Sequence, residues 1–400
     1  MNKGIGRLIG PAFLVLGNVL GVGILAGPIT AGLSGFVPSL LGMLLIWLLM
    51  MASAFVIAHA IKPGSKHFDL PSFYSEKIGG FGKWIAIVCN LIILYGVLVA
   101  YLSGISTIIA RLFPSLNAHQ LPVMLVYFVI MFLLIVTGNK AISKNNIVVI
   151  SLIWICFFLM ISTAFGKFEM STLVGTEEWR YVPIVLPIAI SAFHFHNIIP
   201  TVSKKLDYDF KSTCWAIFIG LLCGLVINVL WSFSVLGSLS YDQIVVSYQH
   251  GVPATVPMAH LLGNTVFMYS GLVFAVLAVT AAFIANGTGL FGFIGDLAHT
   301  YFKVDNKYTI GLISFLPPIA CALIYPKIFV VAISFVGGIG EDLLFLTLPG
   351  VVLLQVAKNK PSSISGWLKL IAWIMILVSI YICIYVFCQK FLGMFKPHFA

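Results

Sequence analysis

The sequence predicts an all-α polytopic membrane protein with eleven transmembrane helices, arranged as two inverted repeats of five plus one extra helix. Apolar residues make up 60% of the 400 residues and charged residues only 8%, whereas a soluble domain carries roughly 25% charge. Long segments, 8–61 and 243–295 among them, contain no Asp, Glu, Lys or Arg. About 20 apolar residues suffice for one helix to cross a bilayer, so the lipid must supply the outer boundary of the fold.

Most uninterrupted apolar segments give one expected span, and the two longest are hairpins or a span plus a loop. The first five spans fall in 1–166, the next five in 167–357, and the eleventh helix with its tail in 358–400. We place the spans at about 8–33, 36–61, 81–111, 121–138, 145–166, 183–202, 213–237, 261–295, 308–325, 328–357 and 367–395.

The net charge of +10 is explained by topology. With the N-terminus in the cytoplasm, sixteen of the 22 Lys and Arg lie on the cytoplasmic side, which is the asymmetry that bacterial membrane proteins show. We therefore expect a multi-pass protein of the inner membrane, surrounded by lipid, with the C-terminus on the opposite side. The basic excess does not indicate a nucleic-acid partner.

The two halves of the chain have corresponding connections. The long polar connection 62–80 follows the second span, and 238–260 follows the seventh. Because five is an odd number, the two halves have opposite orientations and these loops lie on opposite sides. This arrangement is typical of the inverted repeats of secondary transporters.

Inverted repeats further predict that the first helix of each half is broken. The first span reads GNVLGVGILAGP at 17–28, and the sixth has three prolines around SAFHFHN at 191–197. Glycine costs about 1 kcal/mol and proline about 3 kcal/mol inside a helix, relative to alanine. Non-helical backbone at membrane depth survives only where protein buries it or where it lines a wet cavity. The two breaks therefore predict a binding site.

A broken helix offers backbone N–H groups and a positive dipole end to an anion. The segment from Gly21 to Gly27 could hold the carboxylate of an amino acid, and exposed carbonyls of the sixth span could receive its ammonium group. The alternative is that these glycines only allow helices to pack closely.

His194 and His196 are two residues apart and would share one side of an extended break. They are candidates for substrate contacts or proton acceptors, because histidine titrates near neutral pH. The alternative is a hydrogen bond to a neighbouring helix. A metal site would need further ligands, so we expect neither a metal nor another cofactor.

Glu341 and Asp342 are the only acids deep in a span. A carboxylate at the bilayer centre costs roughly 2.5–3.5 kcal/mol on insertion scales. Adjacent helical residues lie about 100° apart, so the two cannot serve one partner equally well. We expect at least one of them to face the cavity and to take up a proton or pair with the substrate ammonium; the alternative is a structural pairing. Glycines at 337, 338 and 340 can open the backbone beside them.

The eighth span carries Asn286 and Thr288 at mid-membrane, where they could line the cavity or offer oxygens to a cation. Close helix packing is the alternative for this run of small residues. Tyr101 on the third span is a weaker candidate.

With these residues, the chain resembles the bacterial aromatic amino acid permeases, the tryptophan/tyrosine permease family of the amino acid–polyamine–organocation superfamily. The segments that carry the resemblance are GNVLGVGILAGPITAG at 17–32, SAFHFHNIIPTVSKKL at 191–206 and GTGLFGFIGDLAH at 287–299. The resemblance implies the fold of the leucine transporter and symport of an amino acid, usually driven by protons.

The resemblance also implies site residues. The unwound first helix, where the substrate backbone binds, is matched by Gly21, Gly23, Ile24, Leu25 and Ala26. The broken sixth helix is matched by Ser191, Phe193, His196 and Asn197.

Three features depart from the family pattern. His194 stands where these permeases usually have a small residue, and the Glu341–Asp342 pair is not expected. Asn18 is similar to the asparagine that supplies a cation oxygen in sodium-coupled branches of this fold.

The sequence thus predicts a secondary active symporter that imports tyrosine or tryptophan with a proton by alternating access, and not an enzyme. The alternatives are a sodium-coupled amino acid transporter, a transporter of the same fold for another small solute, and a metal-dependent integral membrane enzyme. The expected substrate-binding residues are Gly21, Gly23, Ile24, Leu25, Ala26, Ser191, Phe193, His194, His196, Asn197 and Asn286. The expected ion-coupling residues, for H⁺ or Na⁺, are Asn18, His196, Thr288, Glu341 and Asp342.

Overall fold

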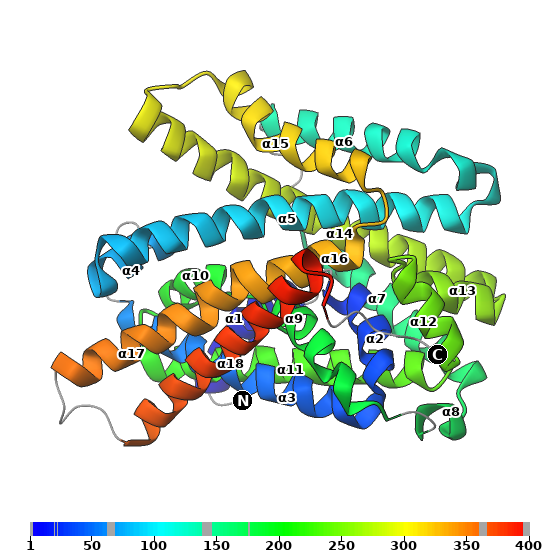
Figure 1. Ribbon diagram of the computed structural model, residues 1–400, viewed down its shortest axis with the longest axis horizontal. Coiled ribbons are helices and arrows are strands. Elements are labelled where there is room, and N and C mark those ends of the chain that lie inside the picture. The colour runs from blue at the N-terminus through cyan, green and yellow to red at the C-terminus, as the bar shows by residue number, and fades with distance from the viewer. Residues whose placement is uncertain are drawn as a thin grey trace.

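The computed structural model describes residues 3–19, 21, 23–61, 69–137, 146–174, 177–359 and 366–394, and every regular element in them is a helix. Long helices lie side by side across the molecule (Figure 1). Part of the connection 62–80 lies outside the described residues, as do six lysines that enter the charge count: Lys62, Lys66, Lys140, Lys144, Lys360 and Lys396.

The first half of the chain contributes seven longer helices and one short 3-10 helix. In order they are α1 (Lys3–Val19), α2 (Gly23–Ser34), α3 (Phe36–Ala60), α4 (Leu70–Ile78), α5 (Gly80–Leu112), η1 (Pro114–His119), α6 (Gln120–Val136) and α7 (Asn146–Ala164).

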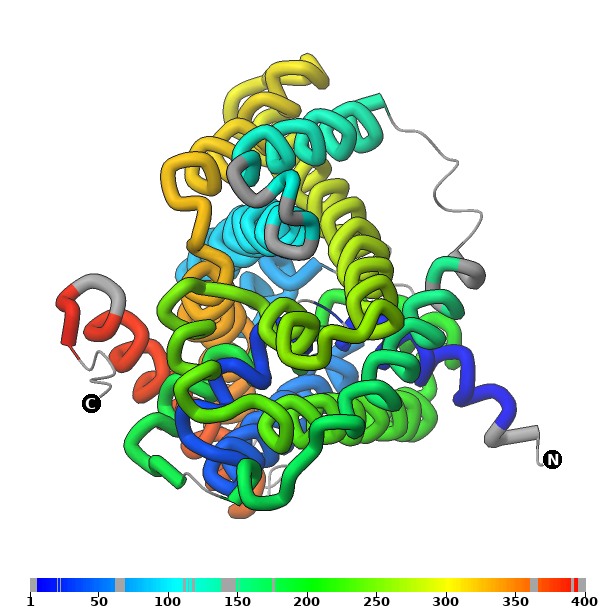
Figure 2. The backbone as a smooth tube through the Cα atoms, turned by 90° about the vertical axis from the view of Figure 1, so that its right-hand side faces the viewer, coloured from blue at the N-terminus to red at the C-terminus, as the bar shows by residue number. Residues whose placement is uncertain are grey.

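Short helical turns then lead to the second half. They are η3 (Phe165–Lys167), α8 (Met170–Val174) and η4 (Trp179–Tyr181). The second half comprises α9 (Val182–Ala192), η5 (His196–Ile198), α10 (Ile199–Lys205), α11 (Phe210–Leu236), α12 (Tyr241–Gln249), α13 (Thr255–Leu262), α14 (Thr265–Leu297), η6 (Ala298–Phe302), α15 (Lys307–Ile324), α16 (Phe329–Phe335), η7 (Val336–Glu341), η8 (Leu343–Thr347) and α17 (Leu348–Asn359). Helix α18 (Gly366–Phe391) follows and packs beside α17 at one edge of the molecule (Figures 1 and 2).

Eight helical segments among the described residues are long and apolar enough to cross a membrane, and the bent pair α1–α2 adds a ninth if it is one span. Two shorter apolar helices, Gln120–Val136 and Ser151–Lys167, stand where the fourth and fifth spans are expected. The chain is therefore a multi-pass helical membrane protein, as predicted. The total of eleven spans stays a prediction.

Both expected breaks are confirmed. Helices α1 and α2 are bent by 58° relative to each other, between Val19 and Gly23. In the sixth span, α9 ends at Ala192 and the chain becomes helical again only at His196. Glycine raises the cost of continuous helix at the first interruption. The second lies between Pro187 of α9 and Pro200 of α10 and itself contains neither glycine nor proline.

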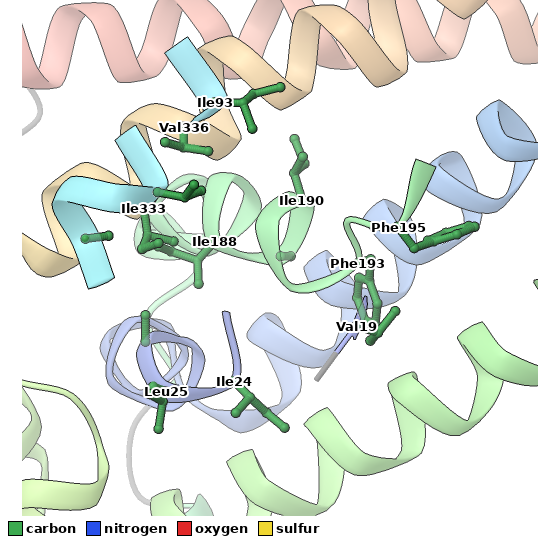
Figure 3. Packing of buried hydrophobic residues seen from close by; sticks show 14 of the residues in the cluster. Val19, Ile24, Leu25, Ile93, Ile188, Ile190, Phe193, Phe195, Ile333 and Val336 are labelled. Carbon is green, nitrogen blue, oxygen red and sulfur yellow. The ribbon is translucent and has the colours of Figure 1, made fainter. Parts of the chain in front are cut away.

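The two breaks are packed against each other. A Cβ on Gly23 would lie 2.5 Å from the Cα of Ala192, so no larger residue fits at the start of α2. Apolar side chains on both sides of the contact, Val19 and Ile24 from the first span and Phe193 from the sixth, belong to one buried cluster (Figure 3). This contact places the two interruptions at one point of the fold.

Small residues also hold α1 against α11. Gly220 and Gly224 are four residues apart and therefore share one face of α11. A Cβ on Gly220 would lie 2.5 Å from the carbonyl oxygen of Ala12, and one on Gly224 would lie 2.5 Å from Cγ1 of Val19. This is the small-xxx-small packing of membrane helices, and it fixes α1 on the seventh expected span.

The tenth expected span is π-helical at its centre, over η7 and η8. Its three glycines each face a different helix: Gly337 faces α9, Gly338 faces α18 and Gly340 faces α5. A π-helical turn inserts a residue into the helical register and often marks a functional site. Here it carries Glu341 and Asp342 into the centre of the molecule.

Candidate functional site

A cavity of about 280 Å³ lies at the two breaks. Helices α1, α5, α7 and α14, the two breaks and the tenth span contribute to its walls. The lining residues are Phe13, Leu14, Gly17, Asn18, Gly21, Gly23, Val97, Tyr101, Val149, Ile153, Ser191, His194, Asn197, Ala278, Ala281, Ala282, Ala285, Asn286, Ile333 and Glu341.

The cavity is open along α1 and closed beyond α2. At the open side, Phe13 is 57% exposed, and Asn18 and Asn197 are also exposed. On the other side, the N–H of Ala254 donates to the carbonyl oxygen of Leu25 (3.0 Å), which ties the segment before α13 to α2. Helix α12 packs on α2 as well. Among the described residues, the cavity is therefore more accessible along α1 than beyond α2.

Glu341 forms the inner wall of the cavity. The Ser191 hydroxyl donates to one carboxylate oxygen (2.6 Å), and Nδ1 of His194 lies 2.8 Å from the other. These two partners cover the carboxylate, so only 1% of Glu341 is exposed, while 16% of the His194 side chain remains exposed. Because Ser191 is near the end of α9 and His194 lies in the sixth-span break, the carboxylate bridges the tenth span to that break.

The far wall combines small apolar side chains with one polar pair. Alanines at 278, 281, 282 and 285 occupy one face of α14, since they follow the i, i+3, i+4, i+7 spacing. Below them, the Asn286 amide donates to the Tyr101 hydroxyl (3.2 Å) and to the carbonyl of Ala282 (3.0 Å). This wall leaves room for a flat apolar group that ends in a polar atom.

The start of α2 presents backbone to the cavity, because Gly21 and Gly23 line it without side chains. The first N–H groups of a helix lack intrahelical partners, although the N–H of Ile24 donates to the carbonyl of Gly21 (3.3 Å). The remaining donors and the helix dipole favour an anion here.

Eight of the residues predicted from the sequence meet in this cavity: Asn18, Gly21, Gly23, Ser191, His194, Asn197, Asn286 and Glu341. The others lie elsewhere. The side chains of Ile24, Leu25, Ala26 and Phe193 are buried in the apolar core, Thr288 is exposed outside the cavity, and His196 and Asp342 are buried away from it.

His196 is enclosed by aromatic rings. Its ring stacks on Phe345 with centroids 4.4 Å apart and lies 4.8 Å from the Phe195 ring. The His194 ring approaches Phe345 as well (4.9 Å). The two histidines thus share one aromatic neighbour on η8, although only His194 reaches the cavity.

The cavity-lining alanines of α14 and Phe345 behind the cavity were not identified from the sequence, and Tyr101 was named only as a weaker candidate. The alanine face of α14 had a detectable signal in its helical spacing, and Tyr101 was a weaker candidate that proves to line the cavity. Phe345 had no such signal, because its role depends on the π-helical register of the tenth span. Among the described residues, no group of three or more His, Cys, Asp or Glu could hold a metal ion.

Fold and cavity together fit a polytopic membrane transporter, with a cavity at two broken helices. A sequence model of the tryptophan/tyrosine permease family matches residues 5–388, and the chain belongs to this family. The match is consistent with the resemblance seen in the sequence.

Individual proteins with similar sequences are named as tyrosine or tryptophan transporters. The tyrosine-specific transport system 1 of Haemophilus influenzae is 28% identical and is matched over 84% of each chain. The tryptophan-specific transport protein of the same organism is 27% identical, over 82% of this chain and 83% of the relative. The low affinity tryptophan permease of Proteus vulgaris is 25% identical, over 91% and 90%.

A solved structure shares the fold. A mutant of the manganese transporter of Eremococcus coleocola superposes with a TM-score of 0.65 at 12% identity, covering 100% of this chain and 90% of the other. At this identity the likeness concerns the fold alone.

Proposed function

We propose that the protein is a secondary active symporter that imports an aromatic amino acid, tyrosine or tryptophan, together with a proton. The observation that carries the proposal is Glu341, a buried carboxylate that lines the cavity and bridges Ser191 and His194. The names of the relatives support the substrate class.

An amino acid fits the cavity in one orientation. Its carboxylate would lie at the N–H groups that begin α2, and its ammonium group would face Glu341. The ring would lie along the alanine face of α14, with its hydroxyl or indole N–H near Asn286 and Tyr101. The substrate carboxylate then lies at the positive end of a helix, and its ammonium group lies at the hydrogen-bond-accepting oxygens of Glu341.

The Glu341–His194 pair provides the coupling. The two groups are one hydrogen bond apart and can share a single proton. With that proton the pair is neutral overall, and without it the pair carries one negative charge inside the protein, which is costly. A zwitterionic substrate and one proton carry one positive charge inward. This charge gains about 2.3 kcal/mol per 100 mV, enough for more than tenfold accumulation.

Alternating access requires two structural halves that can move against each other. Residues 1–166 and 167–357 would be inverted repeats, as in the leucine transporter, with 358–400 outside them and the N-terminus in the cytoplasm. The first, second, sixth and seventh spans would rock against the third, fourth, eighth and ninth. The described conformation, open along α1, would then face the cytoplasm of a cell whose inner membrane holds the protein.

Uptake into proteoliposomes tests the function. We expect a pH gradient to drive accumulation of labelled tyrosine or tryptophan, and Glu341→Gln to abolish accumulation while leaving exchange between equal pools. The matched control is Asp305→Asn, because Asp305 forms a similar 2.7 Å contact with His299 at the surface. This control should accumulate like the wild type.

Three results would contradict the proposal. Accumulation by Glu341→Gln equal to wild type would remove the coupling role. Accumulation driven only by a sodium gradient would favour sodium coupling and direct attention to Asn18. Failure to take up either amino acid under any gradient, from folded protein, would refute the substrate class.

A further inference from the structure

Asp342 is a second buried carboxyl, next to Glu341 on the tenth span but outside the cavity. It is 0% exposed and does not line the cavity. The Ser379 hydroxyl of α18 lies 2.7 Å from Oδ2, and the Thr347 hydroxyl lies 2.5 Å from that of Ser379. Oδ1 is buried and has no hydrogen-bond partner in the described part of the chain.

The surroundings of Asp342 offer no compensating positive charge in the described residues. The titratable groups nearby are the thiols of Cys89 on α5 and Cys383 on α18, both within electrostatic range, and the preceding Glu341, which faces the cavity. Tyr74 of α4 lies near Cys89 and donates its hydroxyl to the Leu344 carbonyl (2.7 Å). Asp342 forms no ion pair among these residues.

An ionised carboxylate does not suit this environment. Burial of a charge in an apolar interior is expensive unless several donors surround it, and here a single hydroxyl approaches one oxygen. A neutral carboxyl suits it better. The acid proton on Oδ2 can be donated to Ser379, whose hydroxyl is in turn donated to Thr347, since the Ser379–Thr347 contact admits either donor.

A proton also fits better than a metal cation. Hard cations such as Ca²⁺ and Mg²⁺ take about six oxygen ligands. The side chains of this cluster supply one carboxyl and two hydroxyls, and Oδ1 has no hydrogen-bond partner in the described part of the chain.

We propose that Asp342, Ser379 and Thr347 form a second proton-binding site, separate from the amino acid cavity and occupied in the described conformation. The site joins the π-helical centre of the tenth span to α18. Loss of the proton would leave a buried charge between them, so exchange of the proton requires η8 and α18 to separate and admit water. The neutral, protonated form of Asp342 therefore stabilises the packing of α18 against the tenth span.

Infrared difference spectroscopy of the full-length protein in lipid tests the occupancy without any need for transport. At neutral pH, we expect the wild type to show a carbonyl stretch of a protonated carboxyl that is absent from Asp342→Asn and retained in Glu341→Gln. Ser379→Ala should shift this band to higher frequency, because it removes the hydrogen-bond partner. Because Ser379→Ala leaves the carboxyl in place, it tests the assignment even if Asp342→Asn does not fold.

The exchange is tested by transfer into D₂O. The band should shift to its deuterated position faster under an imposed pH gradient than at rest. Carboxylate bands assigned to Asp342 at neutral pH, or a spectrum that Ser379→Ala leaves unchanged, would overturn the occupied site. A band that never exchanges under the gradient would overturn the opening of η8 from α18. A failure of amino acid uptake would leave the resting spectrum unaffected, so the two proposals can fail independently.

Discussion

Alanines decide how wide a group the cavity accepts. Ala278, Ala281, Ala282 and Ala285 present one methyl group each from α14, and any larger side chain on that face would enter the cavity. Their helical spacing makes them a continuous wall. At the scale of single residues, therefore, the size of the group that the cavity accepts depends on the absence of larger side chains at these four positions.

Ala282→Phe should reduce tryptophan uptake strongly. The added ring would occupy the space along α14 where the substrate ring is placed, so we expect KM for tryptophan to rise at least tenfold, and more than for tyrosine. Ala320→Phe, at an exposed position of α15 outside the cavity, is the matched control. Unchanged kinetics in Ala282→Phe, measured by initial rates in proteoliposomes, would place the ring elsewhere.

Asn286→Leu tests recognition of the polar atom of the substrate. The amide of Asn286 lies against Tyr101 and the cavity, and one neutral hydrogen bond contributes about 1 kcal/mol, or roughly a fivefold change in affinity. We expect affinity for tyrosine to fall by that factor while affinity for phenylalanine, which lacks the hydroxyl, changes little. Competition of both amino acids against labelled tyrosine measures the difference. An equal loss for both would argue that Asn286 acts only on Tyr101.

At the scale of elements, the contact between α1 and α11 positions one side of the cavity mouth. The residues of α1 at the mouth, Phe13, Leu14, Gly17 and Asn18, are held by close packing on Gly220 and Gly224. The backbone oxygen of Ala12 has no freedom to move aside, so the fit depends on the absence of a side chain at 220.

Gly220→Ala should therefore destabilise the protein. Overpacking of a tight contact costs about 1–3 kcal/mol, and the added methyl would meet backbone 2.5 Å away. A lower melting temperature in detergent than the wild type is expected. Gly10→Ala, on α1, is the matched control, because its added methyl group would have nothing within 4 Å. Its melting temperature should equal that of the wild type. Equal melting temperatures for the two variants would contradict the packing described here.

Asp209 caps the N-terminus of α11, and the stability that this cap contributes depends on pH. Its carboxylate accepts from the N–H of Ser212 (2.8 Å), and hydrogen bonds from Ser212 hold the pKa of Asp209 below its usual value. Because the folded pKa is lower than the unfolded one, this stabilisation is present above the unfolded pKa and lost as pH falls through the folded value. Asp209→Asn, which can cap without titrating, should lose less thermal stability than the wild type on acidification below about pH 4. Identical losses would exclude the cap as the cause.

The first break was predictable from sequence because its cause is local: Gly21 and Gly23 stand at the interruption Val19–Gly23 and disfavour helix. The second was predicted from nearby prolines, but Pro187 and Pro200 both stand within helices, and the interruption at 193–195 contains neither glycine nor proline. The directions of side chains were not predictable in this way. The side chains of Ile24, Leu25 and Ala26 are turned into the core, and only the packing of α2 on α9 and α11 determines that.

The side-chain directions of Glu341 and Asp342 were likewise not predictable from the sequence. The spacing predicted that Glu341 and Asp342 point in different directions, but not which of them reaches the cavity. The π-helical register decides this, and it depends on Gly337, Gly338 and Gly340 lying against three different helices. The position of His196 under Phe345 follows from the same register.

At the scale of the whole molecule, the structure describes a single conformation. The cavity is reached along α1, while α12 and α13 close the space beyond α2. Asn197 stands exposed at the mouth, so its accessibility should report whether the mouth is open and whether a substrate occupies the cavity.

Cysteine labelling tests this in a variant whose seven cysteines are replaced by serine. Asn197→Cys should react with a charged, membrane-impermeant maleimide added from the side of the N-terminus, and tyrosine or tryptophan should slow the reaction at least severalfold by filling the cavity and favouring closure. Lys307→Cys, at the exposed start of α15 and outside the cavity, should react at a rate that the amino acid does not change. Protection of both positions would indicate a general change in the protein. Reaction of Asn197→Cys only from the opposite side would contradict the proposed orientation, in which the cavity opens to the side of the N-terminus.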